Sequence, residues 1–463
     1  MAIRSKELEP TRENLVLTLS KDLLDRNKSV WQFARFCDAQ DDKCSIALNA
    51  KWGSGKTFFV RHVQLLIESF NPVTNAVSEE ERKKIRCAFE QFAGKGENAI
   101  DFEPAVCVYY DAWENDNDGD PIISLVYEII KQNAQHDSFK KEVDCIRAAA
   151  LIADFFTGKN VTDIVDHLQE KDLLAKLKEQ REIHDQVVDF LESLLSEQGN
   201  RLVVFIDELD RCKPEYAVQL LERIKHYLTN DRITFVFSVN IEELQHTIKS
   251  LYGDGFDACR YLDRFFDYRI ELPPANMNRY YQELGLDNGS WIYESVCKAV
   301  IEYLGLGLRE IEKYYRFAKI AAYKPTHQRS GYDFSDEKAN QFSLCIIVPI
   351  VIGLRMVNTE LYDDFITGKN PNPLLDIVGD GDIARGYCSA LLNRSESYDA
   401  DPKAQTTHVS LRDKLVLAYK ALFDDSMRGE YDETRVGEYT FSKRTKSLVL
   451  RVSSMISEYA NYE

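Results

Sequence analysis

The sequence of 463 residues lacks the features that would place it in a membrane or outside the cell. No stretch reaches the roughly 18 consecutive apolar residues that a membrane-spanning helix needs, so we expect no membrane span. The opening residues, MAIRSKELEPTREN, contain no apolar stretch of the kind found in signal peptides, so we expect a cytoplasmic protein. No internal repeat or low-complexity tract is visible either.

Motifs for disulfides and for resident transition metals are also missing. The ten cysteines include no C-x-x-C pair, and the eight histidines show no H-E-x-x-H or similar spacing. Several cysteines lie inside apolar runs, which is typical of reduced core residues. The sequence therefore favours neither a disulfide framework nor a zinc site.

Positive charge is scarce, with 58 Lys and Arg against 76 Asp and Glu, for a formal net charge of −18. Because binding to nucleic acid needs clustered cations, this balance argues against a protein whose whole surface covers nucleic acid. A local basic groove stays open. The basic cluster 82–86 follows three glutamates and predicts a solvated helix face, whereas the basic segment 441–446 would suit phosphate or an acidic partner.

Short apolar runs alternate with helix-like segments in the first 275 residues. The pattern predicts one helix within 11–36, and further helices over 57–70 and 214–228. Because alternating strands and helices build parallel sheets, we expect an α/β fold with helices on both sheet faces. The runs that predict buried strands are 44–50, 105–112, 201–209, 233–240 and 267–272.

The first predicted strand is followed by Ala50-Lys51-Trp52-Gly53-Ser54-Gly55-Lys56-Thr57, which opens a helix. This is the phosphate-loop pattern G-x-x-x-x-G-K-[ST], with Ala50 in place of the first glycine. Backbone N–H groups of such a loop wrap the phosphates, and glycines allow the close approach. We expect Lys56 to reach the β- and γ-phosphates and the Thr57 hydroxyl to bind Mg²⁺.

The predicted strand 201–209 carries Asp207 and Glu208 at its end. We expect Asp207 to hold Mg²⁺ through water, and Glu208 to orient and deprotonate the attacking water. The adjacent glutamate favours hydrolysis over transfer to a bound acceptor, so a small-molecule kinase is disfavoured. Next along the motif, Asp210 and Arg211 would contact a neighbouring subunit, fix the following helix or cap it.

Three further polar residues each have two interpretations. Asn240 ends the strand 233–240 and would sense the γ-phosphate, cap the following helix, or do both. Arg264 would stabilise the transition state, in cis or in trans in a homo-oligomer, or pair with nearby aspartates. Arg309 opens a later helix and would sense ATP or lie on the surface.

Four segments together resemble the KAP family of P-loop NTPases, namely NAKWGSGKTFFV, YYDAWEND, VVFIDELDRC and YLDRFF. The resemblance covers about residues 14–325, with gaps at two inserts. Many members carry transmembrane helices between the Walker motifs, whereas residues 130–200 here offer only AAALIADFF, so the chain resembles a soluble member. Asp25-Arg26 also matches, and Trp113, a large apolar residue, is expected in the core.

The resemblance implies an ASCE-type core, a three-layer α/β P-loop fold with an extra strand between the two Walker strands and a catalytic glutamate. Residues 105–112 would be that extra strand. The resemblance also implies ATP with Mg²⁺, and hydrolysis as a conformational cycle. Many bacterial relatives are similar to anti-phage defence components, so partner proteins from a defence operon are expected.

These observations combine into one set of predictions. We expect a helical segment over 1–40, a KAP-type core over 41–275 with inserts near 71–104 and 130–200, and a mostly α-helical domain over 276–463. The chain would be an ATPase switch in a complex, or alternatively a nucleotide-gated assembly scaffold with slow hydrolysis. The nucleotide-binding residues would be Trp52, Gly53, Ser54, Gly55, Lys56, Thr57 and Phe58, the metal ligands Thr57 and Asp207, and the catalytic residues Glu208, Asn240, Arg264 and Arg309.

Overall fold

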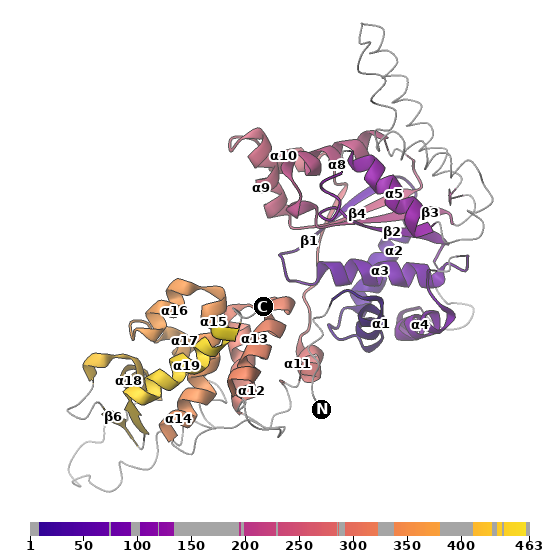
Figure 1. The fold of residues 1–463 in the computed structure, drawn as a ribbon. Helices are drawn as coiled ribbons and strands as arrows, with labels where there is room; N and C mark the ends of the chain where they lie inside the picture. The colour runs from indigo at the N-terminus through magenta and orange to yellow at the C-terminus, as the bar shows by residue number, and fades with distance from the viewer. Residues whose placement is uncertain are drawn as a thin grey trace. The chain divides into compact units, whose positions relative to one another are not determined.

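The chain divides into two compact units, Leu8–Met277 and Asn278–Glu463 (Figure 1). The first unit contains the five-stranded sheet and the second is largely helical. The computed structural model describes residues 9–73, 76–93, 102–118, 120–133, 194–195, 199–227, 230–284, 286, 292–322, 338–379, 411–427, 433–437 and 439–459.

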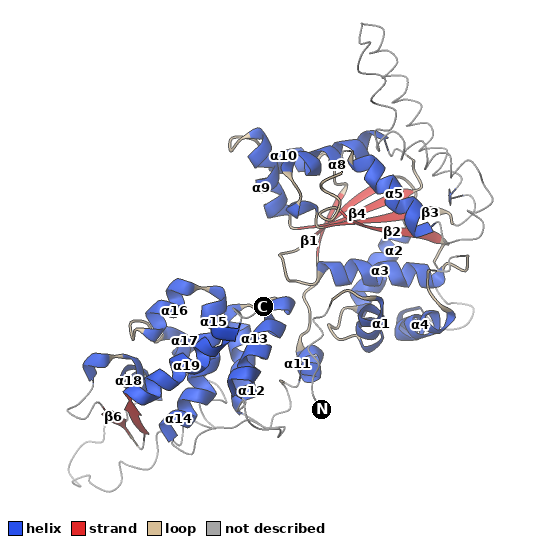
Figure 2. Ribbon diagram, viewed as in Figure 1, coloured by secondary structure: helices blue, strands red, loops and turns tan. Residues whose placement is uncertain are grey.

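The sheet of the first unit consists of five parallel strands in the order β2-β3-β4-β1-β5 (Figure 2). All five strands predicted from apolar runs are present, and their parallel pairing confirms the predicted fold class. Strands β3 and β4 are buried along almost their whole length, because helices cover both faces. The strands are β1 (Cys44–Asn49), β2 (Ala105–Asp111), β3 (Arg201–Asp207), β4 (Ile233–Val239) and β5 (Tyr268–Glu271).

One strand assignment made from the family resemblance is wrong. The run 105–112 forms β2, which lies at the edge of the sheet beside β3. The strand that stands between β1 and β3 is β4, paired in parallel with both. Residues 105–112 therefore lie between the two Walker strands in chain order only, because the chain crosses over β3 to place β4 in the centre.

Alternate residues of each strand feed two separate hydrophobic cores. In β3, Val203 and Phe205 pack with the helices on one face, whereas Val204 and Ile206 pack with those on the other. The first face is covered by α1 (Arg12–Lys21), α2 (Asn27–Asp38), α3 (Lys56–Phe70) and α4 (Glu79–Ala93). The second is covered by α5 (Pro121–Asn133), α8 (Pro214–Tyr227), α9 (Ile241–Tyr252) and α10 (Ala258–Leu262). The result is the expected three-layer arrangement.

The helix predicted within 11–36 is divided into α1 and α2 by a turn over residues 22–26. Asp22 and Asp25 adopt the left-handed backbone conformation there, with φ of 49° and 53°. The Asp22 carboxylate accepts hydrogen bonds from the backbone N–H groups of Arg26 at 2.9 Å and Asn27 at 3.0 Å, which starts α2. The sequence pattern of leucines runs through this turn and so conceals it.

The insert near 71–104 contains α4, whose basic cluster was predicted to be a solvated face. For Arg82 that prediction is wrong. Its side chain is buried, and its Nη1 donates to the carbonyls of Ser69 at 2.7 Å and Asn71 at 2.8 Å, at the C-terminal end of α3. Lys83 and Lys84 are exposed, as predicted. Most of the insert 130–200, including AAALIADFF, lies outside the described residues.

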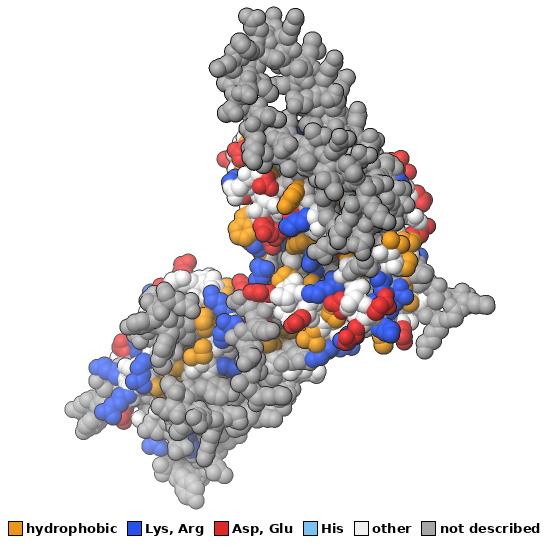
Figure 3. Space-filling model, turned by 45° about the vertical axis from the view of Figure 1, so that its right-hand side comes forward, with side chains coloured by type: hydrophobic (Ala, Val, Ile, Leu, Met, Phe, Trp, Pro, Cys, Tyr) orange, Lys and Arg blue, Asp and Glu red, His pale blue; other side chains and the backbone are white. Residues whose placement is uncertain are grey.

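Charge is distributed over the first unit rather than concentrated. On the face drawn in Figure 3, Lys and Arg side chains are interspersed with Asp and Glu over the described part of this unit. No disulfide links the eight cysteines within the described part of the chain. The described side chains on this face thus form no continuous basic area for a polyanion.

In its described residues, the second unit is built of helices and an antiparallel hairpin, β6 (Glu433–Val436) with β7 (Tyr439–Ser442). A continuous helix, Lys338–Val357, is long and apolar enough to cross a membrane by length and composition, but 67% of its apolar window is buried within the protein, as in a core helix. It comprises α14 (Lys338–Phe342), a π-helical turn and α15 (Val348–Val357). The other helices are α11 (Asn278–Leu284), α12 (Ile292–Leu304), α13 (Leu308–Ala322), α16 (Thr359–Ile366), α17 (Asn372–Val378), α18 (Leu411–Phe423) and α19 (Lys443–Tyr459).

Candidate active site

The candidate site lies at the carboxyl edge of the sheet, where β1 runs through a tight loop into α3. Gly53 and Gly55 adopt left-handed backbone conformations with φ of 77° and 86°, which residues with a Cβ adopt at a cost. Within the loop, the backbone N–H and the Oγ of Ser54 both donate to the Lys51 carbonyl, at 3.4 Å and 2.7 Å. The glycines at these two positions thus let the chain reverse and start α3 at Lys56.

The Lys56 side chain folds back into this loop. Its Nζ donates to the carbonyls of Ala50 at 2.6 Å and Lys51 at 3.3 Å, and the residue is only 8% exposed. Burial lowers the pKa of Lys56, whereas the carboxylates of Asp210, Asp207 and Glu208 raise it. The alanine in place of the first glycine therefore leaves the lysine inside the loop, close to the acids that end β3.

The acidic end of β3 lies two strands away from the loop, with β4 between them. Asp207 is buried, and its carboxylate accepts from the Tyr109 hydroxyl at 3.0 Å and from the Glu208 backbone N–H at 3.0 Å. Asp111 at the end of β2 is paired in register with Asp207. Tyr109 and Asp111 were missed from sequence, although the ending YYD of a predicted strand was a signal for them.

The donors at this edge fit Mg²⁺. The Thr57 hydroxyl and the Asp207 carboxylate are oxygen ligands of the kind that Mg²⁺ prefers. Two strand spacings, roughly 10 Å, separate β1 from β3, which leaves room for an ion that keeps several waters. Among the described residues, no group of three or more His, Cys, Asp or Glu is arranged to hold a metal ion. A magnesium ion here would therefore take further ligands from water and phosphate.

Glu208 is held in an unusual position. Its backbone is left-handed, with φ of 60°, and its Oε2 lies 2.5 Å from Nε of Arg211. Burial, followed by the charge of Asp207, raises the pKa of Glu208 to about 7, and Arg211 lowers it. The carboxylate therefore stands in an electrostatic environment in which binding and release of a proton are close in free energy near neutral pH.

The residues that follow Glu208 form a cluster with two tryptophans. The Trp52 indole N–H donates to Asp210 at 2.6 Å, which ties the phosphate loop to the end of β3. Trp113, expected in the core, is 53% exposed, and that prediction is wrong because its ring flanks Arg211 at the surface. Asp210 does not cap a helix, since α8 begins only at Pro214.

Asn240 occupies the end of β4, between the loop and the acids. Its side-chain oxygen accepts from the Glu242 backbone N–H at 3.2 Å, so it caps α9 as one of its two interpretations predicted. The backbone N–H of the next residue, Ile241, donates to the Asn49 side chain at 2.9 Å. This position is compatible with the second interpretation, a γ-phosphate sensor, which stays a prediction.

The comparison with protein families decides the relationship. The model described as KAP family P-loop domain matches residues 32–294. The chain belongs to the KAP family of P-loop NTPases. No curated protein matches this KAP chain.

Two solved structures from Aeropyrum pernix are similar to the KAP chain at 13% identity. One is the ORC2 protein in ADPNP-ADP complexes, with a TM-score of 0.31, covering 97% of this chain and 95% of that one. The other is the ORC1 protein in complex with DNA, with a TM-score of 0.32, covering 99% and 95%. Likenesses this distant support no inference about the site.

Of the two arginines proposed as catalytic, Arg264 lies in the same unit as this KAP site but is not brought into it, and the role of Arg309 stays a prediction. Arg264 is exposed, and its carbonyl accepts from Lys225 at the end of α8, near the amino-terminal edge of the sheet. Within one chain it thus lies at the edge opposite the phosphate loop, and its role in trans stays a prediction. Arg309 is exposed in the first turn of α13, which belongs to the second unit.

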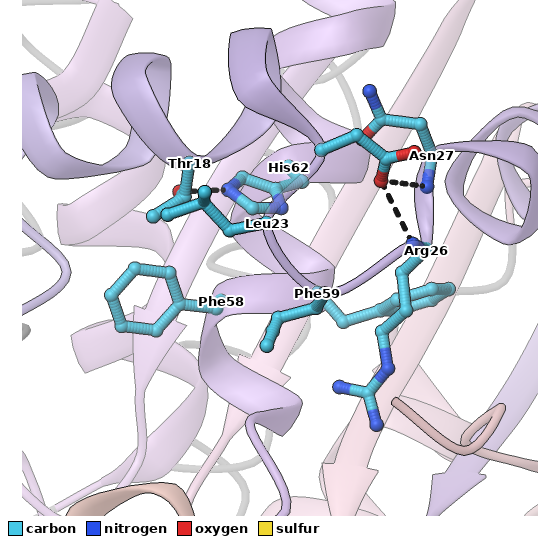
Figure 4. Close-up of a pocket in the computed structure, with 9 residues that line it drawn as sticks. Thr18, Leu23, Arg26, Asn27, Phe58, Phe59 and His62 are labelled. Carbon is cyan, nitrogen blue, oxygen red and sulfur yellow. Dashed lines mark hydrogen bonds between the residues drawn. The ribbon is translucent and has the colours of Figure 1, made fainter. Parts of the chain in front are cut away.

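A small pocket lies behind the KAP phosphate loop, between the turn that joins α1 to α2 and the first turns of α3 (Figure 4). Phe58 lines it, next to His62, whose Nε2 lies 2.9 Å from the Thr18 hydroxyl. Arg26 reaches from this pocket to the loop, where its Nη1 donates to the Ser54 carbonyl at 3.0 Å. The match of Asp25-Arg26 to the family was the signal for this anchor.

Proposed function

We propose that this KAP protein binds ATP with Mg²⁺, hydrolyses it, and acts as a conformational switch or regulator in a cytoplasmic multi-protein complex of bacterial anti-phage defence. One observation carries the nucleotide part of the proposal. The glycine loop with Lys56 follows β1, and the acids Asp207 and Glu208 end β3, at the same sheet edge with only β4 between them; Lys56 is close enough to both acids for them to shift its pKa.

The loop supplies the binding site for the triphosphate. Backbone N–H groups over residues 53–58 would donate to phosphate oxygens, together with the start of α3. Lys56 would exchange its bonds to the carbonyls of Ala50 and Lys51 for bonds to the β- and γ-phosphates. Phe58, which follows Thr57, would lie nearest the nucleoside, beside the pocket behind the loop. Mg²⁺, held by Thr57 and through water by Asp207, would neutralise negative charge on the phosphates.

Glu208 would carry the proton transfer in hydrolysis. It accepts a proton from water as the water oxygen bonds to the γ-phosphorus, and the bond to the bridging oxygen breaks to give ADP and phosphate. A carboxylate whose pKa is raised to about 7 is suited to this role. Asn240, at the end of the strand between loop and acids, would orient the water or sense the γ-phosphate.

The second candidate is a nucleotide-gated scaffold that activates a partner effector and hydrolyses ATP slowly or incidentally. The ion pair between Glu208 and Arg211 favours it, because a carboxylate engaged by an arginine is less free to accept a proton. Both candidates need ATP at the loop. They differ in whether turnover or mere occupancy produces the biological output.

Two substitutions test the proposal on the purified full-length chain. Lys56→Ala should abolish binding of a fluorescent ATP analogue, because the loop loses its charge. Glu208→Gln should bind the analogue as wild type does, yet release phosphate at least about 100-fold more slowly, because only the base is lost. Lys84→Ala and Glu80→Gln, on the exposed face of α4, are the controls and should match wild type. Unchanged phosphate release from Glu208→Gln would refute the mechanism.

A phage-challenge assay in cells separates the switch from the scaffold. If the chain is a switch, both Lys56→Ala and Glu208→Gln lose protection, and a partner co-purifies in a manner that depends on turnover. If it is a scaffold, Glu208→Gln keeps protection and Lys56→Ala loses it. Full protection by Lys56→Ala would exclude both.

A further inference from the structure

The proposed hydrolysis requires the Glu208 carboxylate to accept a proton from water, but in the structure this carboxylate forms an ion pair with Arg211. The ion pair with Arg211 spans 2.5 Å and closes a single 3-10 turn, η4 (Leu209–Arg211). The Arg211 backbone N–H donates to the Glu208 carbonyl at 3.1 Å, which keeps the two side chains on the same turn. The pair is thus set by local backbone geometry, and Glu208 is left-handed within it.

Two tryptophan rings fix Arg211 in turn. The carbon at the centre of its guanidinium lies 5.5 Å from the ring centroid of Trp52 and 5.7 Å from that of Trp113. Such cation–π contacts favour a guanidinium over a ring face. The rings are 49% and 53% exposed, which is unusual for tryptophan and is explained by their contact with a charged group at the rim of the site.

The two rings come from different segments of the site. Trp52 belongs to the phosphate loop, and its indole N–H donates to Asp210 at 2.6 Å. Trp113 follows β2, which pairs with β3 through Asp111 and Asp207. The restraint on Glu208 therefore depends on where the phosphate loop lies relative to the end of β3.

We propose that Arg211 is a positioning residue that restrains Glu208, and that Trp52 and Trp113 hold Arg211 in its restraining position. The inference rests on the proposed function, because it concerns the rate of that same hydrolysis. While it is paired with Arg211, the Glu208 carboxylate binds a guanidinium rather than the attacking water. The pair thereby slows the hydrolysis of ATP that is already bound in the loop.

The test compares phosphate release at saturating ATP across three variants of the full-length chain. Arg211→Gln should raise kcat roughly fivefold, because the free energy of a partly exposed ion pair corresponds to a factor of about this size. KM should change by less than about twofold. Trp113→Ala should raise kcat by a smaller factor, since it removes one ring without touching the phosphate loop. Arg211→Lys, which keeps the charge but not the planar fork, should lie between wild type and Arg211→Gln.

Two controls isolate the role of Arg211. In a Glu208→Gln background, Arg211→Gln should have no effect on kcat, because Arg211 acts through Glu208. Arg35→Gln removes a matched ion pair, since Arg35 lies 2.6 Å from Asp38 in the same i,i+3 relation and stands 5.3 Å from the ring of Phe102. That pair lies next to the start of β2, at the amino-terminal ends of the strands and so opposite the phosphate loop. Its loss should leave kcat unchanged.

Each outcome decides the inference. The strongest support for the inference would be that the Arg211→Gln variant hydrolyses ATP while the wild-type protein does not. An unchanged or lower kcat for Arg211→Gln in a folded protein would overturn it, as would absence of hydrolysis in both. If Lys56→Ala abolishes wild-type activity while Arg211→Gln changes nothing, the proposed function stands and only the role of Arg211 fails.

Discussion

Replacement of Arg26 by methionine tests whether the hydrogen bond from Arg26 to the Ser54 carbonyl holds the phosphate loop in its binding conformation. The Arg26 side chain is 6% exposed, and its Nη1 donates to the Ser54 carbonyl at 3.0 Å, in the centre of the loop. Burial lowers its pKa to about 10. Methionine keeps much of the length and the apolar contact with the pocket, but it removes the charge and the hydrogen bond.

The expected effects on stability and on affinity differ. A pKa lowered from 12.5 to about 10 corresponds to about 3 kcal/mol against the buried charge. A hydrogen bond from a charged donor returns about 1.5–3 kcal/mol. Because these terms nearly cancel, the free energy of unfolding should change by less than about 1.5 kcal/mol. The loop, however, loses an anchor that holds it in the binding conformation, so the Kd for ATP should rise about tenfold, or 1.4 kcal/mol.

The assay is titration with a fluorescent ATP analogue, paired with urea unfolding without nucleotide. Arg35→Met is the matched control, since Arg35 lies on α2, the helix that directly follows Arg26, and contacts Asp38 rather than the loop. It should leave the affinity unchanged. If Arg26→Met binds the analogue within twofold of wild type while remaining folded, the loop does not depend on this anchor and the reasoning is wrong.

Two further predictions concern stability. Burial raises the pKa of Glu68 to about 7 from the ordinary value of 4.5. Between these two pH values the folded state keeps a proton that the unfolded state releases. The free energy of unfolding therefore has its full value below pH 4.5 and falls by about 3 kcal/mol as the pH rises through 7. Glu68→Gln should therefore match wild type in urea at pH 5 and exceed it at pH 8, and a less stable variant at pH 8 would contradict this. Arg82→Ala should lower the free energy of unfolding by about 3 kcal/mol, because the Ser69 and Asn71 carbonyls lose their donor. Lys83→Ala, at an exposed position, should lower it by less than about 0.5 kcal/mol. Equal losses for the two variants would show that Arg82 is a surface residue.

Much of the site could be predicted because its chemistry is local. The glycines at 53 and 55, the lysine after them and the acids after an apolar run are each defined by neighbours in the chain, and the strands around them are continuous apolar segments. Parallel strands bring their carboxyl ends to one edge, so the loop and the acids meet without further information. The capping role of Asn240 follows in the same way from its place before α9.

The errors arise where a residue's partner is distant in sequence. Arg82 looked solvated because its neighbours are charged, yet its partners are carbonyls at the end of α3. Trp113 looked like a core residue because it is large and apolar, yet a guanidinium near the site covers one side of it.

The amino-acid order alone determined which segments become strands, where the phosphate loop lies and which acids end a strand, because hydrophobic periodicity and glycine conformations act over a few residues. Only the tertiary structure decided that β4 rather than β2 separates the loop from the acids, and that Arg26 and Arg82 are occupied by particular carbonyls. Strand order depends on how long crossovers pack, and a buried guanidinium takes whichever acceptors that packing brings within reach, so neither is encoded in any short stretch of the chain.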